Sequence, residues 1–137
     1  MIVVDASVFI KLFVAEDDSE QAARFLSENK GALYAPSLLL HEILKNALHH
    51  EVPVSDIYRL LDATETKLMN QTQDVSERAF QIAKIGSKEQ GRPTLEDSVY
   101  HALALELGAT FLTADRRHYE RTKHLGAVQL FSEMVAS

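Results

Sequence analysis

The chain has 137 residues, 46% of them hydrophobic and 25% charged, so it can form one folded domain and is too apolar for disorder. It has a formal net charge of −6 and no cysteine, which excludes disulfides and thiolate metal sites. No apolar run reaches the roughly 18 residues of a membrane span, and the absence of cysteine fits a cytoplasmic protein.

In chain order, the first half predicts a strand, two helices, a second strand and a third helix. These elements span residues 2–5, 6–14, 19–29, 32–35 and 37–50. Asp5 ends the first strand, Pro36 stops the second, and Ser37 is expected to cap the helix that follows.

The second half predicts a helix, a short strand, two helices, a strand, a further helix and a last strand. They span residues 55–70, 71–75, 76–90, 94–107, 110–113, 115 onward and 128–131. Ser55 and Ser76 are expected as helix caps. Strands that alternate with helices predict a parallel sheet with helices on both faces. We find no linker or repeat, so residues 1–137 are predicted to form one domain.

Four acidic residues stand where strands end or helices start. Asp5 and Asp115 follow predicted strands, Glu42 lies in the helix after the second strand, and Asp97 lies in the first turn of the 94–107 helix. The carboxyl ends of parallel strands meet at one edge of a sheet, where ligands bind. Like charges gathered there repel each other, so this cluster implies a bound cation or a shifted pKa.

Each acid also has a purely structural explanation. Asp5 and Asp115 suit the N-cap position of a helix, and Thr94 with Asp97 resembles a capping box. Glu42 stands beside an apolar stripe, where a buried Glu needs a partner, but it can also face solvent at the edge of that stripe. Four such acids together are harder to explain in this way.

Hydroxyl and basic side chains accompany the acids. Ser7 and Thr113 can bind substrate or a water molecule, or can serve as ordinary cap and strand residues.

Basic residues cluster just after Asp115 and just before Asp97, and Arg116 is the first candidate to contact substrate. They are Arg116, Arg117, Arg121, Lys123, Lys84, Lys88 and Arg92. These residues form either a basic rim around an acidic pocket or a solvated helix face. The net charge of −6 opposes nucleic-acid binding unless metal ions reverse the local sign.

The six histidines do not predict a zinc site. His41 and Glu42 begin an H-E-x-x-H pattern, but Lys45 occupies the place of the second His. His49 and His50 lie near a helix end and are expected at the surface. His101 can contact substrate, although a surface or packing role is the simpler interpretation.

The chain resembles PIN-domain nucleases of the small type found as VapC toxins in toxin–antitoxin pairs. The matching residues are Asp5-Ala-Ser7, Glu42, Asp97-Ser-Val-Tyr-His-Ala-Leu-Ala104 with Leu107-Gly108-Ala109, and Leu112-Thr-Ala-Asp115. The resemblance implies an α/β, three-layer Rossmann-like PIN fold with a short parallel sheet of four to five strands. It also implies a Mg²⁺ or Mn²⁺ site with Asp5, Glu42 and Asp97 as the core ligands and Asp115 as an outer ligand.

The implied activity is endoribonuclease cleavage of RNA phosphodiester bonds, with divalent ions that neutralise the phosphate and activate a water molecule. The implied partners are RNA, a VapB-like antitoxin and a second copy of the chain. The segment 55–70 can carry more apolar side chains than a core of this size can bury. The excess would then contact a second copy of the chain or an antitoxin. Ordinary packing in the core is the alternative. These apolar side chains are those of Ile57, Leu60, Leu61 and Leu68.

Four other functions are alternatives at this stage. The chain can be an inactive PIN-like module that binds RNA or protein, or a PIN nuclease of RNA maturation. A receiver-like phosphoacceptor domain also clusters acids, but it needs a Lys after a late strand, where Asp115 stands. A haloacid-dehalogenase phosphatase needs a second acid where Ser7 stands.

Overall fold

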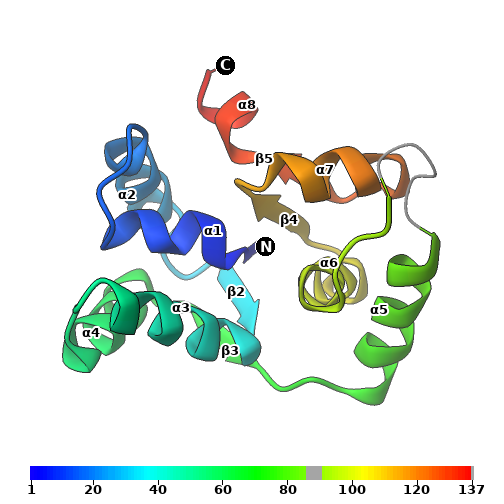
Figure 1. The fold of residues 1–137 in the computed structure, drawn as a ribbon, viewed down its shortest axis with the longest axis horizontal. Helices are drawn as coiled ribbons and strands as arrows, with labels where there is room; N and C mark the ends of the chain where they lie inside the picture. Colours follow the sequence, from blue (N-terminus) through cyan, green and yellow to red (C-terminus); the bar gives the residue numbers. More distant parts are fainter. Residues whose placement is uncertain (86–90, 137) are drawn as a thin grey trace.

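The centre of the protein is a parallel sheet of five strands in the order β3-β2-β1-β4-β5 (Figure 1). The computed structural model describes residues 1–85 and 91–136. The strands are β1 (Ile2–Val4), β2 (Leu33–Pro36), β3 (Lys67–Met69), β4 (Thr110–Thr113) and β5 (Val128–Leu130). In the register, Val3 of β1 lies beside Tyr34 of β2 and Phe111 of β4. The predicted parallel sheet is confirmed.

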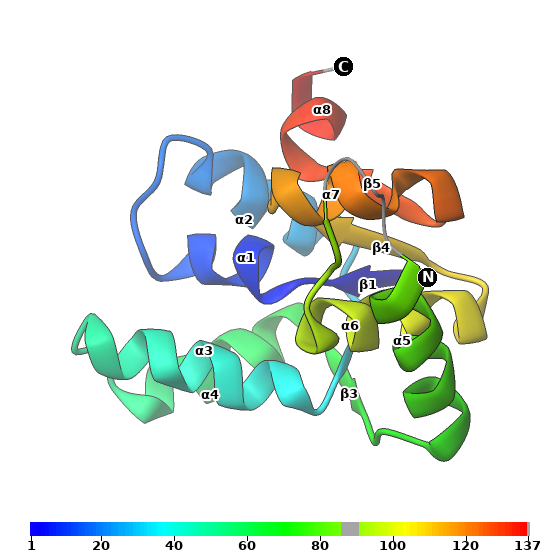
Figure 2. The same cartoon turned by 45° about the vertical axis from the view of Figure 1, so that its right-hand side comes forward.

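Helices cover both faces of this sheet, as Figures 1 and 2 show. One side carries α1 (Ala6–Phe9), a 3-10 turn (Ile10–Leu12), α2 (Ser19–Glu28), α3 (Leu38–His49) and α4 (Val54–Thr64). The other side carries α5 (Gln73–Ile85), α6 (Leu95–Leu107) and α7 (Arg116–Thr122). A 3-10 turn (Lys123–Leu125) precedes β5, and α8 (Phe131–Ala136) follows it. Among the described residues, no helix has the length and apolar character needed to cross a membrane.

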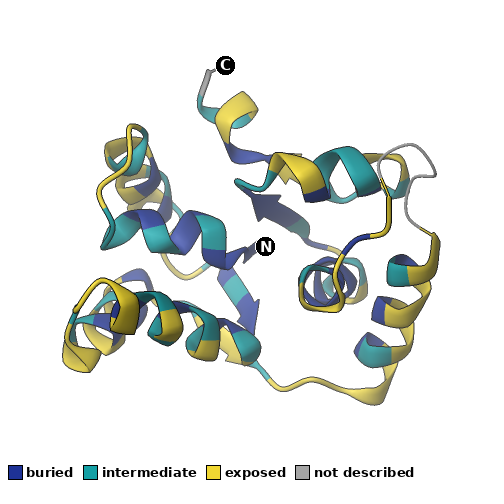
Figure 3. Cartoon of the chain, in the orientation of Figure 1, coloured by how far each residue is buried: buried dark blue, intermediate teal, exposed yellow. Residues whose placement is uncertain are grey.

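The most deeply buried helix is α6, which packs between the sheet and α5. Seven consecutive residues of α6, Ser98–Ala104, are buried, so all sides of this part of the helix are covered by other elements (Figure 3). Tyr100 stacks on Phe111 of β4 with the ring centroids 5.8 Å apart. Each fully buried aromatic side chain contributes roughly 1.5–3 kcal/mol, so α6 is a rigid support for any residue in its first turn.

The third strand lies earlier in the chain than predicted. The helix expected to reach Asn70 ends at Thr64, because Glu65 takes a left-handed conformation with φ 51°. The strand expected at 71–75 is instead Lys67–Met69, which pairs with β2. No glycine marks this helix end, so the sequence carried no local signal for it.

Several helix boundaries also differ from the prediction. Ser37 stands at the N-cap of α3 as predicted, but its side chain makes no cap bond. The predicted caps Ser55 and Ser76 are wrong, because Pro53 precedes α4 and the Thr72 hydroxyl accepts from the Val75 N–H at the start of α5. The helix predicted over 6–14 is a short α1 followed by a 3-10 turn, and α8 was not predicted. The predicted extension of α5 to Gln90 lies outside the described residues.

Candidate active site

At the carboxyl edge of the sheet, the connections of the neighbouring strands β1 and β4 run in opposite directions. The chain leaves β1 toward α1 on one side of the sheet and leaves β4 toward α7 on the other (Figure 1). Such a reversal of connections is the usual position of a ligand site in an open α/β sheet. Asp5 follows β1 directly, and its backbone N–H donates to the carbonyl of Leu112 in β4 at 2.9 Å. The strand pairing therefore places Asp5 beside Thr113 and Asp115.

Two hydroxyl groups hold the carboxylate of Asp5. Oδ2 accepts from the Ser7 hydroxyl at 2.5 Å and from the Thr113 hydroxyl at 2.8 Å. The Ser7 hydroxyl also accepts from the Ala114 N–H at 2.9 Å, and that of Thr113 accepts from the Asp115 N–H at 3.0 Å. Ser7 and Thr113 thus lock the end of β1 to the end of β4 and fix one orientation of the acid.

Asp5 is a buried acid with a raised pKa. Its side chain is 4% exposed, and burial, followed by the charge of Asp97, raises its pKa from 3.8 to about 6. The hydrogen bonds from Ser7 and Thr113 oppose this rise. The Asp5 side chain makes no cap bond to α1, so its expected structural role as a side-chain N-cap is wrong.

Glu42 is held by a residue that sequence reasoning missed, Tyr100 of α6. The Tyr100 side chain is fully buried, and its hydroxyl donates to Oε1 of Glu42 across 58 positions of sequence. Burial raises the pKa of Glu42, the Tyr100 bond lowers it, and the charge of Asp5 raises it. A buried tyrosine needs a hydrogen-bond partner for its hydroxyl, so a tyrosine within an apolar helix indicates a polar partner. Nothing in the sequence identified Glu42 as that partner.

Asp97 lies in the first turn of α6. Its backbone N–H donates to the Thr94 hydroxyl at 3.1 Å, so Thr94 caps the helix as predicted. The Asp97 side chain is 22% exposed, and Oδ2 lies 3.8 Å from Nδ1 of His118. Burial and then the charge of Asp115 raise the pKa of Asp97 to about 6.

Asp115 combines a structural role with an electrostatic one. Its Oδ1 accepts from the N–H groups of Arg117 at 2.9 Å and His118 at 3.3 Å, so it is the N-cap of α7. Its charge also raises the pKa values of Asp5 and Asp97. The structure therefore supports the cap explanation for this acid and also places it near the other carboxylates.

Two buried histidines next to the acids do not offset their charge. Burial lowers the pKa of His118 to about 4 and also lowers that of His101, so both rings are neutral at pH 7. His101 is buried, with Nε2 2.8 Å from the carbonyl of Gly126, which fits a packing role. Neither ring nitrogen of His118 has a hydrogen-bond partner in the described part of the chain.

In the described part of the chain the acidic cluster has no basic partner at ion-pair distance, although the charge of Lys45 lowers the pKa of Glu42. Within the described residues, no Lys or Arg lies within 4.0 Å of the four carboxylates, and Arg116 instead approaches Glu133 of α8 at 3.9 Å. Oxygen donors with uncompensated negative charge fit a hard divalent cation. In the positions described, no three Asp, Glu or His side chains are spaced to share one ion.

The family model of the PIN domain matches residues 2–125, a range that contains all four acids. The chain belongs to the PIN-domain family. No curated protein matches its sequence.

Two solved structures share the fold of this PIN domain. A chain of a toxin–antitoxin complex from Klebsiella pneumoniae has 16% identity and a TM-score of 0.68, with 94% of this chain and 96% of that chain covered. The sarcin–ricin loop cleaving toxin VapC20 of Mycobacterium tuberculosis has 15% identity and a TM-score of 0.63, with 83% and 88% covered. At these identities the similarity establishes the architecture.

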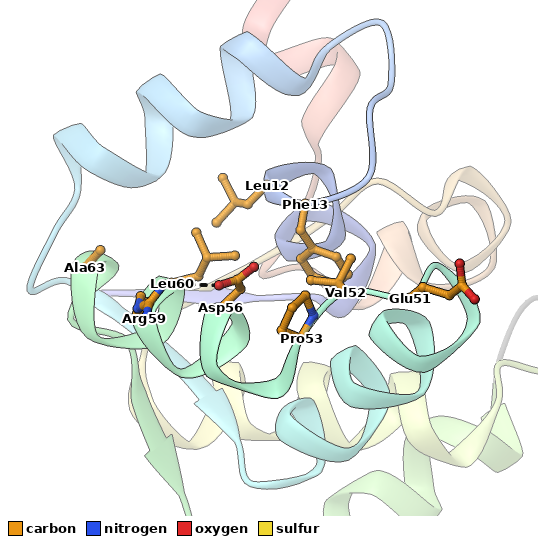
Figure 4. A pocket seen from close by; sticks show the side chains of 9 residues that line it. All are labelled: Leu12, Phe13, Glu51, Val52, Pro53, Asp56, Arg59, Leu60 and Ala63. Atoms are coloured by element: carbon orange, nitrogen blue, oxygen red, sulfur yellow. Dashed lines mark hydrogen bonds and ion pairs between the residues drawn. The ribbon is translucent and has the colours of Figure 1, made fainter.

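This PIN domain also has an open apolar pocket of about 530 Å³ away from the acids, between the 3-10 turn after α1 and the α3–α4 connection (Figure 4). Its lining residues are Leu12, Phe13, Glu51, Val52, Pro53, Asp56, Arg59, Leu60 and Ala63. Of the residues predicted to exceed the core, Ile57 and Leu61 are buried, Leu60 lines this pocket and Leu68 is exposed. Leu60 is also half-buried against the core, so ordinary packing explains three of the four, all except Leu68.

Proposed function

We propose that this PIN domain, comprising residues 1–137, is a Mg²⁺- or Mn²⁺-dependent endoribonuclease and the toxin of a VapBC-type toxin–antitoxin pair. The observation that carries the proposal is the gathering of Asp5, Glu42, Asp97 and Asp115 at one sheet edge without a basic partner at ion-pair distance among the described residues. Keeping mutually repelling carboxylates together destabilises the fold unless a cation binds them. Membership of the PIN family and the similarity to a chain of a toxin–antitoxin complex and to a sarcin–ricin loop cleaving toxin support RNA and an antitoxin as partners.

Two of the proposed ligands are oriented by hydroxyl groups. Asp5, Glu42 and Asp97 would hold the ion, with Asp115 as an outer ligand. Ser7 and Thr113 orient Asp5, and Tyr100 orients Glu42. When bound, a divalent ion would supply charge neutralisation of the phosphate and a lowered pKa for the attacking water.

Substrate contacts are proposed at the rim of this cluster. The Arg116 side chain is 61% exposed, and its 3.9 Å approach to Glu133 is a weak surface pair. Arg116 can therefore exchange this contact for an RNA phosphate. The hydroxyl groups of Ser7 and Thr113 already donate to Asp5. We therefore propose that these two residues orient Asp5 and act on the substrate only through that carboxylate.

The proposed protein partners are a VapB-like antitoxin and a second copy of the chain, in the cytoplasm. For the antitoxin, the pocket beside Leu12, Phe13 and Leu60 offers apolar walls with the charged Asp56–Arg59 pair at one side (Figure 4). Asp56 and Arg59 lie 3.2 Å apart and pair with each other. We therefore expect the apolar walls to supply most of the free energy of antitoxin binding.

Cleavage of a labelled RNA in Mg²⁺ tests the proposed activity. Asp5→Asn and Asp97→Asn are expected to lower the cleavage rate by roughly 100-fold or more, because each removes a ligand charge. Asp17→Asn, at an exposed turn, is the matched control and should cleave like wild type. Unchanged cleavage by both site variants would reject this site. RNA binding without cleavage by the wild type would favour the inactive PIN-like module.

A further inference from the structure

A pocket of about 270 Å³ lies between the C-terminal half of α5 and the start of α6, outside the acidic cluster. It is lined by Phe80, Ala83, Lys84, Arg92 and Leu95, which we call the α5–α6 patch. Phe80 is 56% exposed and Leu95 46% exposed, so two large apolar side chains face solvent side by side. Nothing in the described core covers them.

The α5–α6 patch combines apolar and positive groups in a protein whose net charge is −6. Two of its five lining residues, Lys84 and Arg92, are cationic and none is acidic. Neither cation forms an ion pair with another described residue. An exposed aromatic ring in one pocket with two cations matches the chemistry of single-stranded nucleic acid, which offers flat bases and negative phosphates at once.

We propose that the α5–α6 patch is an RNA subsite in which an unpaired base stacks on Phe80 while Lys84 and Arg92 hold the flanking phosphates. This inference rests on the proposed ribonuclease function, and it adds a preference for single-stranded RNA next to the cleavage site. It assigns a role to residues on α5 that have no contact with the acids.

The position of the patch relative to the acids fits one continuous RNA strand. Leu95 of the patch and Asp97 of the cluster are two residues apart in the first turn of α6, so they lie on roughly opposite sides of that helix. A helix with its side chains is about 10–12 Å across, which sets the approximate separation of the two sites. A strand passing over the N-terminal end of α6 can therefore occupy both.

Arg121 of α7 lies beside Gly91, the residue before Arg92 of the patch. A Cβ atom added to Gly91 would lie 3.7 Å from a guanidinium nitrogen of Arg121, so this side chain lies directly against the segment that leads into α6. Gly91 has φ 85°, a left-handed conformation that favours glycine. The structure thus places Arg121, from the basic group after Asp115, beside the residue that precedes Arg92 of the patch.

A second copy of the chain fits the patch less well than RNA does. A twofold contact centred on the patch would place the same surface of each copy against the other, with Lys84 and Arg92 facing the identical cations. RNA instead neutralises both charges. The two occupants predict different results in solution, which the experiment below separates.

The chain contains no tryptophan, so Phe80→Trp introduces a single indole reporter at the patch. In an Asp97→Asn background, which keeps the RNA intact, addition of a single-stranded oligonucleotide should quench the fluorescence of this indole. Tyr58→Trp, at a 48% exposed aromatic position on α4, is the matched control and should not be quenched. Phe80→Ala should weaken oligonucleotide affinity, measured by anisotropy, about 10-fold, whereas Tyr58→Ala should leave it unchanged.

Three results would overturn the proposal. An oligonucleotide that binds without quenching the Phe80→Trp indole excludes stacking there and leaves the nuclease function intact. Unchanged RNA affinity in Phe80→Ala, together with loss of self-association in sedimentation, would assign the patch to a second copy. Absence of both RNA binding and RNA cleavage in the wild type would reject the proposed function and this subsite with it.

Discussion

Replacement of Asp5 by Asn should stabilise the metal-free protein. Burial and the charge of Asp97 raise the pKa of Asp5 from 3.8 to about 6. One pKa unit corresponds to about 1.36 kcal/mol, so ionised Asp5 costs the native state about 3 kcal/mol at neutral pH. The new amide N–H₂ group must find an acceptor, so we expect a gain of about 2 kcal/mol in the free energy of unfolding. For a chain of this size that is a rise in Tm of roughly 8 °C.

The gain should depend on pH in a defined direction. Because the folded-state pKa lies above the unfolded one, the proton on Asp5 contributes stability that is fully present below pH 3.8 and is lost as the pH rises through about 6. The difference between Asp5→Asn and wild type should therefore be small near pH 4 and reach its full size near pH 7. The assay is urea unfolding in EDTA, with Asp17→Asn as the exposed control. An Asp5→Asn variant that is no more stable than wild type at pH 7 would refute the reasoning.

Further predictions concern the metal and the groups that orient its proposed ligands. Mn²⁺ should raise the Tm of the wild type but leave that of Asp5→Asn nearly unchanged, because only the wild type retains the full carboxylate set. Tyr100→Phe should weaken Mn²⁺ binding, measured by calorimetry, by about 10- to 100-fold, because Glu42 loses the hydrogen bond that orients it. Tyr58→Phe, at an exposed position, should leave Mn²⁺ binding unchanged. Excess Mn²⁺ should restore RNA cleavage by Tyr100→Phe. Thr113→Val removes a bond that lowers the pKa of Asp5, so the pH at which cleavage begins should move upward, and an unchanged pH profile would contradict that role.

The sequence was sufficient to predict the sheet and the position of the acids, because both depend on local patterns. Apolar runs followed by Asp5 and Asp115 predict strand ends, and strand ends of a parallel sheet meet at one edge. Glu42 stood out as an acid beside an apolar stripe. The resemblance to PIN domains, now confirmed as family membership, supplied the grouping of these acids into one site.

Features that depend on packing between distant elements could not be predicted in this way. The bond from Tyr100 to Glu42 joins α6 to α3, helices on opposite sides of the sheet, and no spacing within either helix indicates the partner. The left-handed turn at Glu65, which sets the start of β3, occurs without a glycine. The contact of Arg121 with Gly91 likewise requires α7 to fold back over the entry to α6.

The central claim, that the four carboxylates exist to hold a divalent cation, is tested most directly by diffraction from crystals grown in Mn²⁺. Anomalous scattering locates manganese independently of any assumption about its ligands. We predict a peak within about 2.0–2.3 Å of carboxylate oxygens of Asp5 and of at least one of Glu42 and Asp97. A fully formed crystal with manganese only at other surface positions, and none at this sheet edge, would contradict the account.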